Sequence, residues 1–306
     1  MAGSAKKVLF DKRSLALSAA RLKAWWEGAP FDAAAFEAQF EPAPPVAAND
    51  AAEDLFEPER DQRLAALQLV WGEGRLAPGD DTIDELAPAR LAAPDGGALA
   101  VFGPGLARPV ISLAPGWAGA IAVYEWRKET RAALTAGLKA AGLAERVAVH
   151  PFDLETGHIG DETLDGLIST DDFTYCENPS RLAVQFARAL KPGCGGLIEA
   201  YAAAPGPDVA PGFASAFAEP QLHTAAKIGE LLFEAGFRIE EDEDLTALHA
   251  EWARAGFQRL KVSLAAPSLS ARGLQELAWE METWRARLRL LDAGRMQRRA
   301  WRVTRR

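Results

Sequence analysis

Short apolar runs alternate with longer segments of helical character between residues 99 and 201. Segments such as Glu129–Ala141 and Arg181–Leu190 have apolar residues at helical spacing. Five runs have the length of buried strands: Leu99–Phe102, Ala120–Tyr124, Arg146–Val149, Asp165–Ser169 and Gly195–Ala200. Strand-sized runs that alternate with helices are typical of βαβ units and a parallel sheet. The pattern therefore predicts a doubly wound α/β domain, in which ligands bind beyond the carboxyl ends of the strands.

The periodic pattern continues on both sides of this stretch. A short amphipathic helix is predicted over Arg63–Trp71, and the glycines and proline of residues 72–80 predict a turn-rich loop that serves as a lid or a packing corner. Beyond residue 201 the pattern predicts three helices and two further strands. The helices are Ala225–Ala235, Leu245–Gln258 and Leu274–Leu291, and the strands are Gly236–Glu240 and Met296–Thr304.

The first 58 residues differ in composition from the rest. Residues 1–40 contain two helical patterns rich in Trp and Phe, and residues 41–58 have the Pro, Ala and acidic composition of a linker. We therefore expect an N-terminal helical arm and linker over 1–58 and an α/β domain over 59–306. The arm either covers its own domain or docks on a partner in a homo- or hetero-oligomer, and a membrane surface is the less favoured alternative.

Charge and composition narrow the classes of function. The net charge of −9 argues against a general nucleic-acid binder. The segment Arg285–Arg306 has nine arginines and one aspartate, which we interpret as a helix and strand facing the acidic run Glu240–Asp244, with a phosphate-binding tail as the alternative. Cys176 and Cys194 form no disulfide framework, the four histidines have no metal-ligand spacing, and no apolar segment reaches 18 residues. A cytoplasmic protein without a metal or a transmembrane segment is expected.

Several motifs together resemble a known family. The segment from Trp71 to Asp80 (WGEGRLAPGD), the five-strand stretch and the turn sequence Leu190–Gly195 resemble class I S-adenosylmethionine-dependent methyltransferases, particularly bacterial enzymes that act on small molecules. The resemblance covers about residues 60–306. It implies a mostly parallel, seven-stranded Rossmann-like sheet with helices on both faces, S-adenosylmethionine as cofactor and a small-molecule methyl acceptor. The turn sequence is expected to stop a helix and turn tightly into the fifth strand.

The first glycine-rich loop departs from the family pattern of an acidic residue followed by Gly-x-Gly-x-Gly. Gly103 and Gly105 are retained as expected cofactor-binding residues, but Val101 stands at the acidic position and Ala107 at the third glycine. Arg108 follows where a small residue is usual, and it either holds a carboxylate or fills the pocket. A hydrogen bond to a charged group contributes about 1.5–3 kcal/mol, so the loss of the carboxylate at position 101 weakens cofactor affinity by roughly one to two decades.

The resemblance also implies roles at the ends of the next three strands. Glu125 would accept the ribose hydroxyls, while Phe152 and Asp153 would hold the adenine ring and its amino group. Asp171 and Tyr175 would lie between cofactor and acceptor as general base or orienting group. Each acidic residue has a plainer interpretation: a solvated charge for Glu125, an N-cap for Asp153, and capping of a helix for the adjacent aspartates that begin at Asp171.

Two hypotheses follow for the function. The first is methyl transfer from S-adenosylmethionine to a small molecule, which the retained acidic positions favour. The second is a catalytically degenerate methyltransferase homologue with a structural or regulatory role, paired with an active relative through the N-terminal arm or the basic tail, which the altered loop favours.

Overall fold

The computed structural model describes residues 57–91, 93, 96–205, 222–263 and 269–306. All of the described residues belong to one compact unit, which spans residues 54–306. The helical patterns predicted within residues 1–40 lie outside the described residues, as does the predicted linker except for its last two residues.

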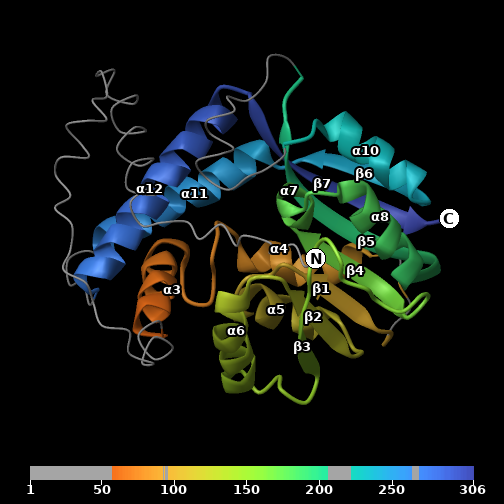
Figure 1. Cartoon of the computed structure of the whole chain (residues 1–306), viewed down its shortest axis with the longest axis horizontal. Coiled ribbons are helices and arrows are strands. Elements are labelled where there is room, and N and C mark those ends of the chain that lie inside the picture. Colours follow the sequence, from red (N-terminus) through yellow and green to blue (C-terminus); the bar gives the residue numbers. More distant parts are fainter. Residues whose placement is uncertain (1–56, 92, 94–95, 206–221, 264–268) are drawn as a thin grey trace, which may run out of the picture. The chain divides into compact units, whose positions relative to one another are not determined.

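Seven strands form one sheet in the order β3-β2-β1-β4-β5-β7-β6 (Figure 1). The strands are β1 Leu99–Phe102, β2 Ile121–Glu125, β3 Val147–Pro151, β4 Leu164–Thr170, β5 Leu190–Ala203, β6 Phe237–Asp244 and β7 Met296–Arg305. Neighbouring strands from β3 to β5 pair in parallel, and β7 is antiparallel to both β5 and β6. The predicted doubly wound, mostly parallel sheet is confirmed, and its strand order reverses between β1 and β4.

The longer helices lie where the periodicity predicts them. They are α3 Glu57–Trp71, α6 Lys128–Ala140, α8 Pro179–Ala189, α10 Ala225–Glu234, α11 Thr246–Ser263 and α12 Ala271–Asp292. Two short helices were not predicted, α4 Asp81–Leu86 and α5 Ala107–Leu113, and a third, α7 Asp172–Tyr175, begins at the adjacent aspartates, where a helix start is expected. Helices of four to seven residues span at most two turns, so their apolar residues establish no period.

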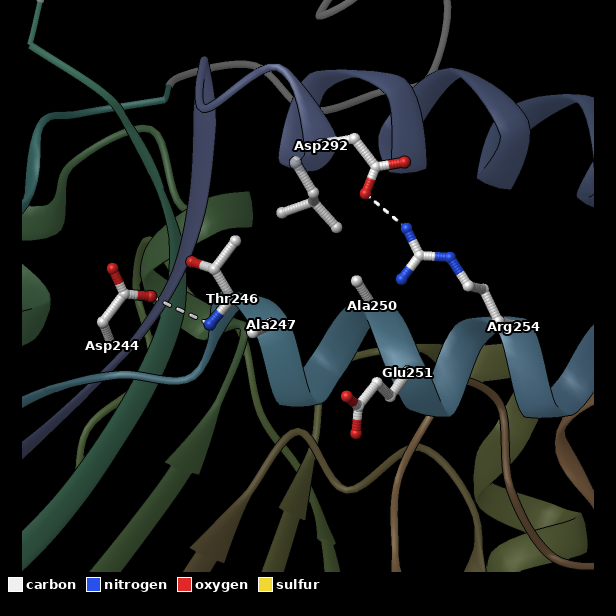
Figure 2. Close-up of a pocket in the computed structure, with 8 residues that line it drawn as sticks. Asp244, Thr246, Ala247, Ala250, Glu251, Arg254 and Asp292 are labelled. Carbon is white, nitrogen blue, oxygen red and sulfur yellow. Dashed lines mark hydrogen bonds and ion pairs between the residues drawn. The ribbon is translucent and has the colours of Figure 1, made fainter.

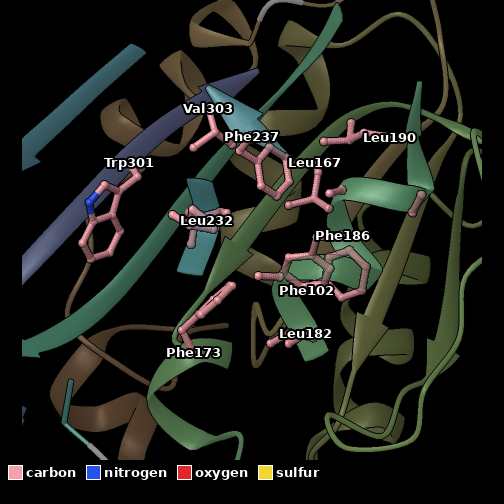
Figure 3. Close-up of a cluster of buried hydrophobic side chains, with 14 of the residues drawn as sticks. Phe102, Leu167, Phe173, Leu182, Phe186, Leu190, Leu232, Phe237, Trp301 and Val303 are labelled. Carbon is pink, nitrogen blue, oxygen red and sulfur yellow. The ribbon is translucent and has the colours of Figure 1, made fainter. Parts of the chain in front are cut away.

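Successive side chains of a strand point to opposite faces of the sheet, and a separate apolar core forms on each face. In β1, Leu99 and Val101 pack with Val110 and Leu134 of α5 and α6. Phe102 points to the other face (Figure 3). There it contributes to a cluster with the buried residues Phe173, Leu182, Phe186, Ile228, Leu232 and Trp301. The central strand β1 is apolar and buried along its whole length, as expected for a strand covered on both faces.

A third apolar cluster joins α3, α11 and α12, which we call the cap. The rings of Trp71 in α3 and Trp284 in α12 lie 4.9 Å apart. Their indole N–H groups donate to the same oxygen, Oε1 of Glu280, at 2.8 and 2.9 Å. Both α11 and α12 lie between β6 and β7 in sequence, and Figure 1 shows them beside α3 at one end of the sheet. Two helices of the cap are therefore inserted before the last strand of the sheet, and the third, α3, precedes the first strand.

The turn sequence at residues 190–195 differs in part from its prediction. Helix α8 ends at Ala189 as expected, but the following residues already belong to β5. The pairing with β4 moves from Leu164↔Leu190 to Gly166↔Gly195, so β5 bulges there, and Gly193 has a φ of 78°. A bulge accommodates the extra residues without interrupting the strand.

The basic C-terminal strand faces the acidic run, as interpreted from the charges. Arg299 lies 2.6 Å from Asp242 and 3.2 Å from Asp244, and Arg302 lies 3.2 Å from Glu241. Cys176 and Cys194 are free and buried. Within the described part of the chain, no helix is both long and apolar enough to span a membrane.

We expect Phe186→Ala to lower the free energy of unfolding by about 3–5 kcal/mol, because the side chain is fully buried and its ring lies 4.6 Å from that of Phe102. Urea unfolding measures this loss. Val184→Ala is the matched control, since this side chain in the same helix is 42% exposed and its truncation should change stability by about 0.5 kcal/mol or less. Equal losses in the two variants would contradict the packing described.

Candidate functional site

The loop after β1 passes close to the end of β4, at the point where the strand order reverses. Gly103 and Gly105 have φ angles of 64° and 76°, which favour glycine. A Cβ atom on Gly103 would lie 2.5 Å from the Thr170 carbonyl oxygen and 2.7 Å from Oδ1 of Asp172. The two glycines therefore allow an approach between backbone segments that any larger residue would block.

Glu125 at the end of β2 is fully buried and is bound to this loop. Its Oε2 accepts a hydrogen bond from the Gly105 N–H at 2.7 Å. Its Oε1 accepts from the backbone N–H of Arg127 at 2.8 Å and from Nη1 of the same residue at 2.9 Å. Glu125 is therefore not a solvated charge; it joins the end of β2 to the glycine loop.

Asp172 is a second buried carboxyl group beside the loop, and the sequence analysis did not select it. Its Oδ2 accepts a hydrogen bond from the Ser169 hydroxyl at 2.7 Å, whereas its Oδ1 has no hydrogen-bond partner among the described residues. Burial raises the pKa of Asp172 to about 8. The group is therefore largely protonated at neutral pH in this state.

Asp171 points toward β7 and not toward the loop. This residue has a φ of 68°, and its side chain does not cap α7. Its carboxylate forms an ion pair with Nη1 of Arg298, whose Nη2 donates to Oε2 of Glu199 at 3.0 Å. Burial opposes the charge of Arg298, but the two carboxylates outweigh it and hold the pKa of the guanidinium above its ordinary value. The proposed helix-capping role of Asp171 is not observed.

Tyr175 lies between the strand ends and the cap. Its ring centroid is 5.2 Å from that of Trp126, and the guanidinium of Arg127 lies 4.0 Å above the Trp126 ring. From the cap, Nη2 of Arg287 donates to the Tyr175 hydroxyl at 3.4 Å. Tyr175 is thus in contact with groups from the loop after β2 and from α12.

Beneath the cap, Tyr201 and His249 complete a buried polar cluster. The Tyr201 hydroxyl and Nε2 of His249 are 2.7 Å apart. Burial, followed by the charges of Arg298 and Arg287, holds the pKa of His249 well below its ordinary value, so the imidazole is neutral. The guanidinium groups of Arg298 and Arg287 lie 5.0 and 5.6 Å from the Tyr201 ring. The cluster therefore combines cations with aromatic faces.

Phe152 and Asp153 follow β3, away from this polar cluster. Phe152 is buried, with its ring 5.2 Å from that of Phe102. Oδ1 of Asp153 accepts the backbone N–H groups of Glu155 and Thr156, each at 2.8 Å, and these hydrogen bonds lower the pKa of Asp153. Asp153 thus caps a turn, in line with the plainer interpretation of this residue.

The loop of residues 72–80 covers the glycine loop. The Arg108 N–H donates to the Gly74 carbonyl at 2.9 Å, and a Cβ atom on Gly105 would lie 2.7 Å from Cδ1 of Leu76. The Arg108 side chain forms an ion pair with Asp81 of α4, so it holds a carboxylate and does not fill the pocket. Val101, at the position where the family has an acid, is buried in the apolar core.

A groove of about 410 Å³ lies between the start of α11 and the end of α12 (Figure 2). Arg254 forms an ion pair with Asp292 across it, and the Asp244 carboxylate accepts the Thr246 N–H at 2.9 Å. These charged groups are satisfied within the groove, which therefore gives no indication of a ligand. Among the described residues, no group of His, Cys, Asp and Glu side chains is arranged to hold a metal ion.

Comparison with known proteins gives the fold. No family model and no curated protein sequence matches the chain, but many solved structures do. The chain has the class I S-adenosylmethionine-dependent methyltransferase fold. One similar structure is phosphoethanolamine N-methyltransferase 2 of Haemonchus contortus with S-adenosylhomocysteine, at a TM-score of 0.67 and 18% identity over 87% of this chain. The chain spans 62% of the length of that protein.

Two further structures show how varied the chemistry on this fold is. The [4+2]-cyclase SpnF matches with a TM-score of 0.66 and 16% identity, over 81% of this chain and 94% of its own. The cyclopropane synthase MmaA2 of Mycobacterium tuberculosis matches with a TM-score of 0.60 and 14% identity, over 73% of this chain and 83% of its own. At such identities the likeness establishes the fold, and the function must be argued from the site.

The titration of Asp172 predicts a difference in pH dependence between the wild type and Asp172→Asn. Because the pKa in the folded state is about 8 and the ordinary value is 3.8, the carboxyl group contributes most stability below pH 4 and loses it as the pH rises through 8. We expect the stability of the wild type relative to Asp172→Asn to fall by about 1 kcal/mol per pH unit between pH 5 and 7. Urea unfolding at several pH values measures this, with the exposed Glu145→Gln as control. Parallel curves for the wild type and Asp172→Asn would contradict it.

Proposed function

We propose that the chain binds S-adenosylmethionine at the carboxyl ends of β1, β2 and β4 and transfers its methyl group to a small-molecule acceptor beneath the cap. The observation that carries this proposal is the fully buried Glu125 carboxylate bound to the Gly105 N–H. Burying a carboxylate is costly unless it is paired and hydrogen-bonded, as Glu125 is, and it lies beside a glycine loop at the reversal of strand order, where sheets of this kind bind ligands.

The residues present fit the cofactor in three respects. Glu125 has two oxygens that can accept ribose hydroxyls once Arg127 yields one of its hydrogen bonds. The lack of a side chain at Gly103 lets the loop after β1 lie against the end of β4, where sheets of this kind bind ligands. Asp153, at the end of the adjacent β3, remains the candidate for the adenine amino group, with Phe152 behind it.

The bound cofactor supplies an electrophilic methyl group on a sulfonium, so the chain's own residues need only bind and orient the acceptor. Methyl transfer by in-line displacement depends mainly on such positioning. The Asp171 carboxylate is committed to Arg298, which favours an orienting role over that of a free general base. The Tyr175 hydroxyl, in contact with Arg287, is the second group that can orient an acceptor.

A catalytically degenerate homologue is the second candidate, and one observation favours it. Leu76 packs on Gly105, and Arg127 donates hydrogen bonds to the Glu125 carboxylate. Both parts of the proposed cofactor site therefore already have contacts within the chain. In this case Glu125 acts as a structural link between β2 and the glycine loop.

Calorimetric titration with S-adenosylhomocysteine distinguishes the two candidates. We expect saturable binding by the wild type and at least tenfold weaker binding by Glu125→Ala, because a charged acceptor of two hydroxyls is lost. The matched control is Glu129→Ala, an exposed acidic residue in the first turn of α6. A thermal-shift series checks that each variant is folded. A folded wild type that does not bind the ligand at millimolar concentration would favour the degenerate homologue.

A further inference from the structure

Arg127, two residues after Glu125, saturates the carboxylate that the proposed function assigns to the ribose. Its Nη1 donates to Oε1 of Glu125 at 2.9 Å and to Oε2 at 3.2 Å. Each oxygen also accepts one backbone N–H, from Arg127 itself at Oε1 and from Gly105 at Oε2. A carboxylate oxygen accepts about two hydrogen bonds, so a ribose hydroxyl and the Arg127 guanidinium exclude one another at Glu125.

The Arg127 guanidinium lies between this carboxylate and the region proposed for the methyl acceptor. Its Cζ is 4.0 Å from the ring centroid of Trp126 and 6.0 Å from that of Tyr175. The Glu125 side chain is fully buried, whereas that of Arg127 is 21% exposed. The guanidinium can therefore leave Glu125 and turn toward Tyr175 while it stays stacked on Trp126, a contact that stabilises a cation.

A second guanidinium lies beside Tyr175 on the side of the cap. Nη2 of Arg287 donates to the Tyr175 hydroxyl at 3.4 Å, and its Cζ is 5.0 Å from the Trp284 ring. If Arg127 turns from Glu125 toward Tyr175, it approaches a group of the same charge, and this repulsion is strong where little water is present. An anion between the two groups removes the repulsion, and guanidinium groups bind carboxylates and phosphates through paired hydrogen bonds.

We propose that the methyl acceptor carries a carboxylate or a phosphate, which attracts the Arg127 guanidinium away from Glu125 and makes the ribose site accessible. This inference rests on the proposed function, and it names the substrate class of the same site. The anion gives Arg127 a new partner, and the ribose hydroxyls give Glu125 new donors. Cofactor and anionic acceptor therefore bind cooperatively, and each raises the affinity for the other by the same factor.

Calorimetric titration with S-adenosylhomocysteine in three sodium salts tests this inference. The salts are chloride, acetate and inorganic phosphate, at pH 7 and equal ionic strength. For the wild type we expect at least threefold tighter binding in acetate or phosphate than in chloride, and the salt with the larger effect distinguishes a carboxylate acceptor from a phosphate acceptor. Arg127→Ala should bind about tenfold more tightly than the wild type in chloride, because the ribose no longer displaces a charged donor, and should not respond to the other two anions.

The controls separate the failure of this inference from the failure of the proposed function. Lys128→Ala removes an exposed cation at the neighbouring position and should behave as the wild type in all three salts. A thermal-shift series shows whether Arg127→Ala is folded, and if it is not, the comparison of the three salts in the wild type still decides.

Equal affinity of the wild type in the three salts would overturn this inference alone, as would a folded Arg127→Ala that binds no more tightly than the wild type. Binding by neither the wild type nor folded Arg127→Ala in any of the salts would overturn the proposed function and this inference with it.

Discussion

The hydrogen bonds of the buried Glu125 carboxylate determine how the strand ends are arranged. A carboxylate without water must receive its hydrogen bonds from the protein, and Glu125 receives them from Gly105 and from Arg127. These bonds fix the glycine loop against β2, while the missing side chain of Gly103 allows the same loop to approach the end of β4. The loop thus joins the ends of β2 and β4.

The cap encloses the other side of the site with a different kind of interaction. Apolar packing of Trp71 against Trp284 joins α3 to α12, and the Glu280 carboxyl group satisfies both indole N–H groups. The polar residues beneath it, from Tyr175 to Arg298, are held by ion pairs and by contacts with aromatic rings. Charged groups at the strand ends thus lie beside aromatic residues packed under the cap.

Sequence patterns predicted the sheet and the long helices, because buried strands appear as short apolar runs and long helices as apolar residues at helical spacing. They could not rank the adjacent acids at the end of β4, since the left-handed φ of Asp171 sends its side chain toward Arg298 and leaves Asp172 beside the loop. The role of Arg298 could not be predicted either, because one arginine in a strongly basic segment cannot be distinguished from the surface arginines around it. Its burial arises from the place of β7 between β5 and β6, which no local pattern reveals.

The position of β7 also has a consequence for the order of folding. Among the described strands, β6 pairs only with β7, and the two strands are separated in sequence by the whole of α11 and α12. Closing so long a connection costs chain entropy before the strands can pair, so these contacts form late. Until β7 is in place, Asp171 and Glu199 have no Arg298 beside them. We therefore expect the ion pairs of Arg298 to form in a late stage of folding, after the parallel strands that support them.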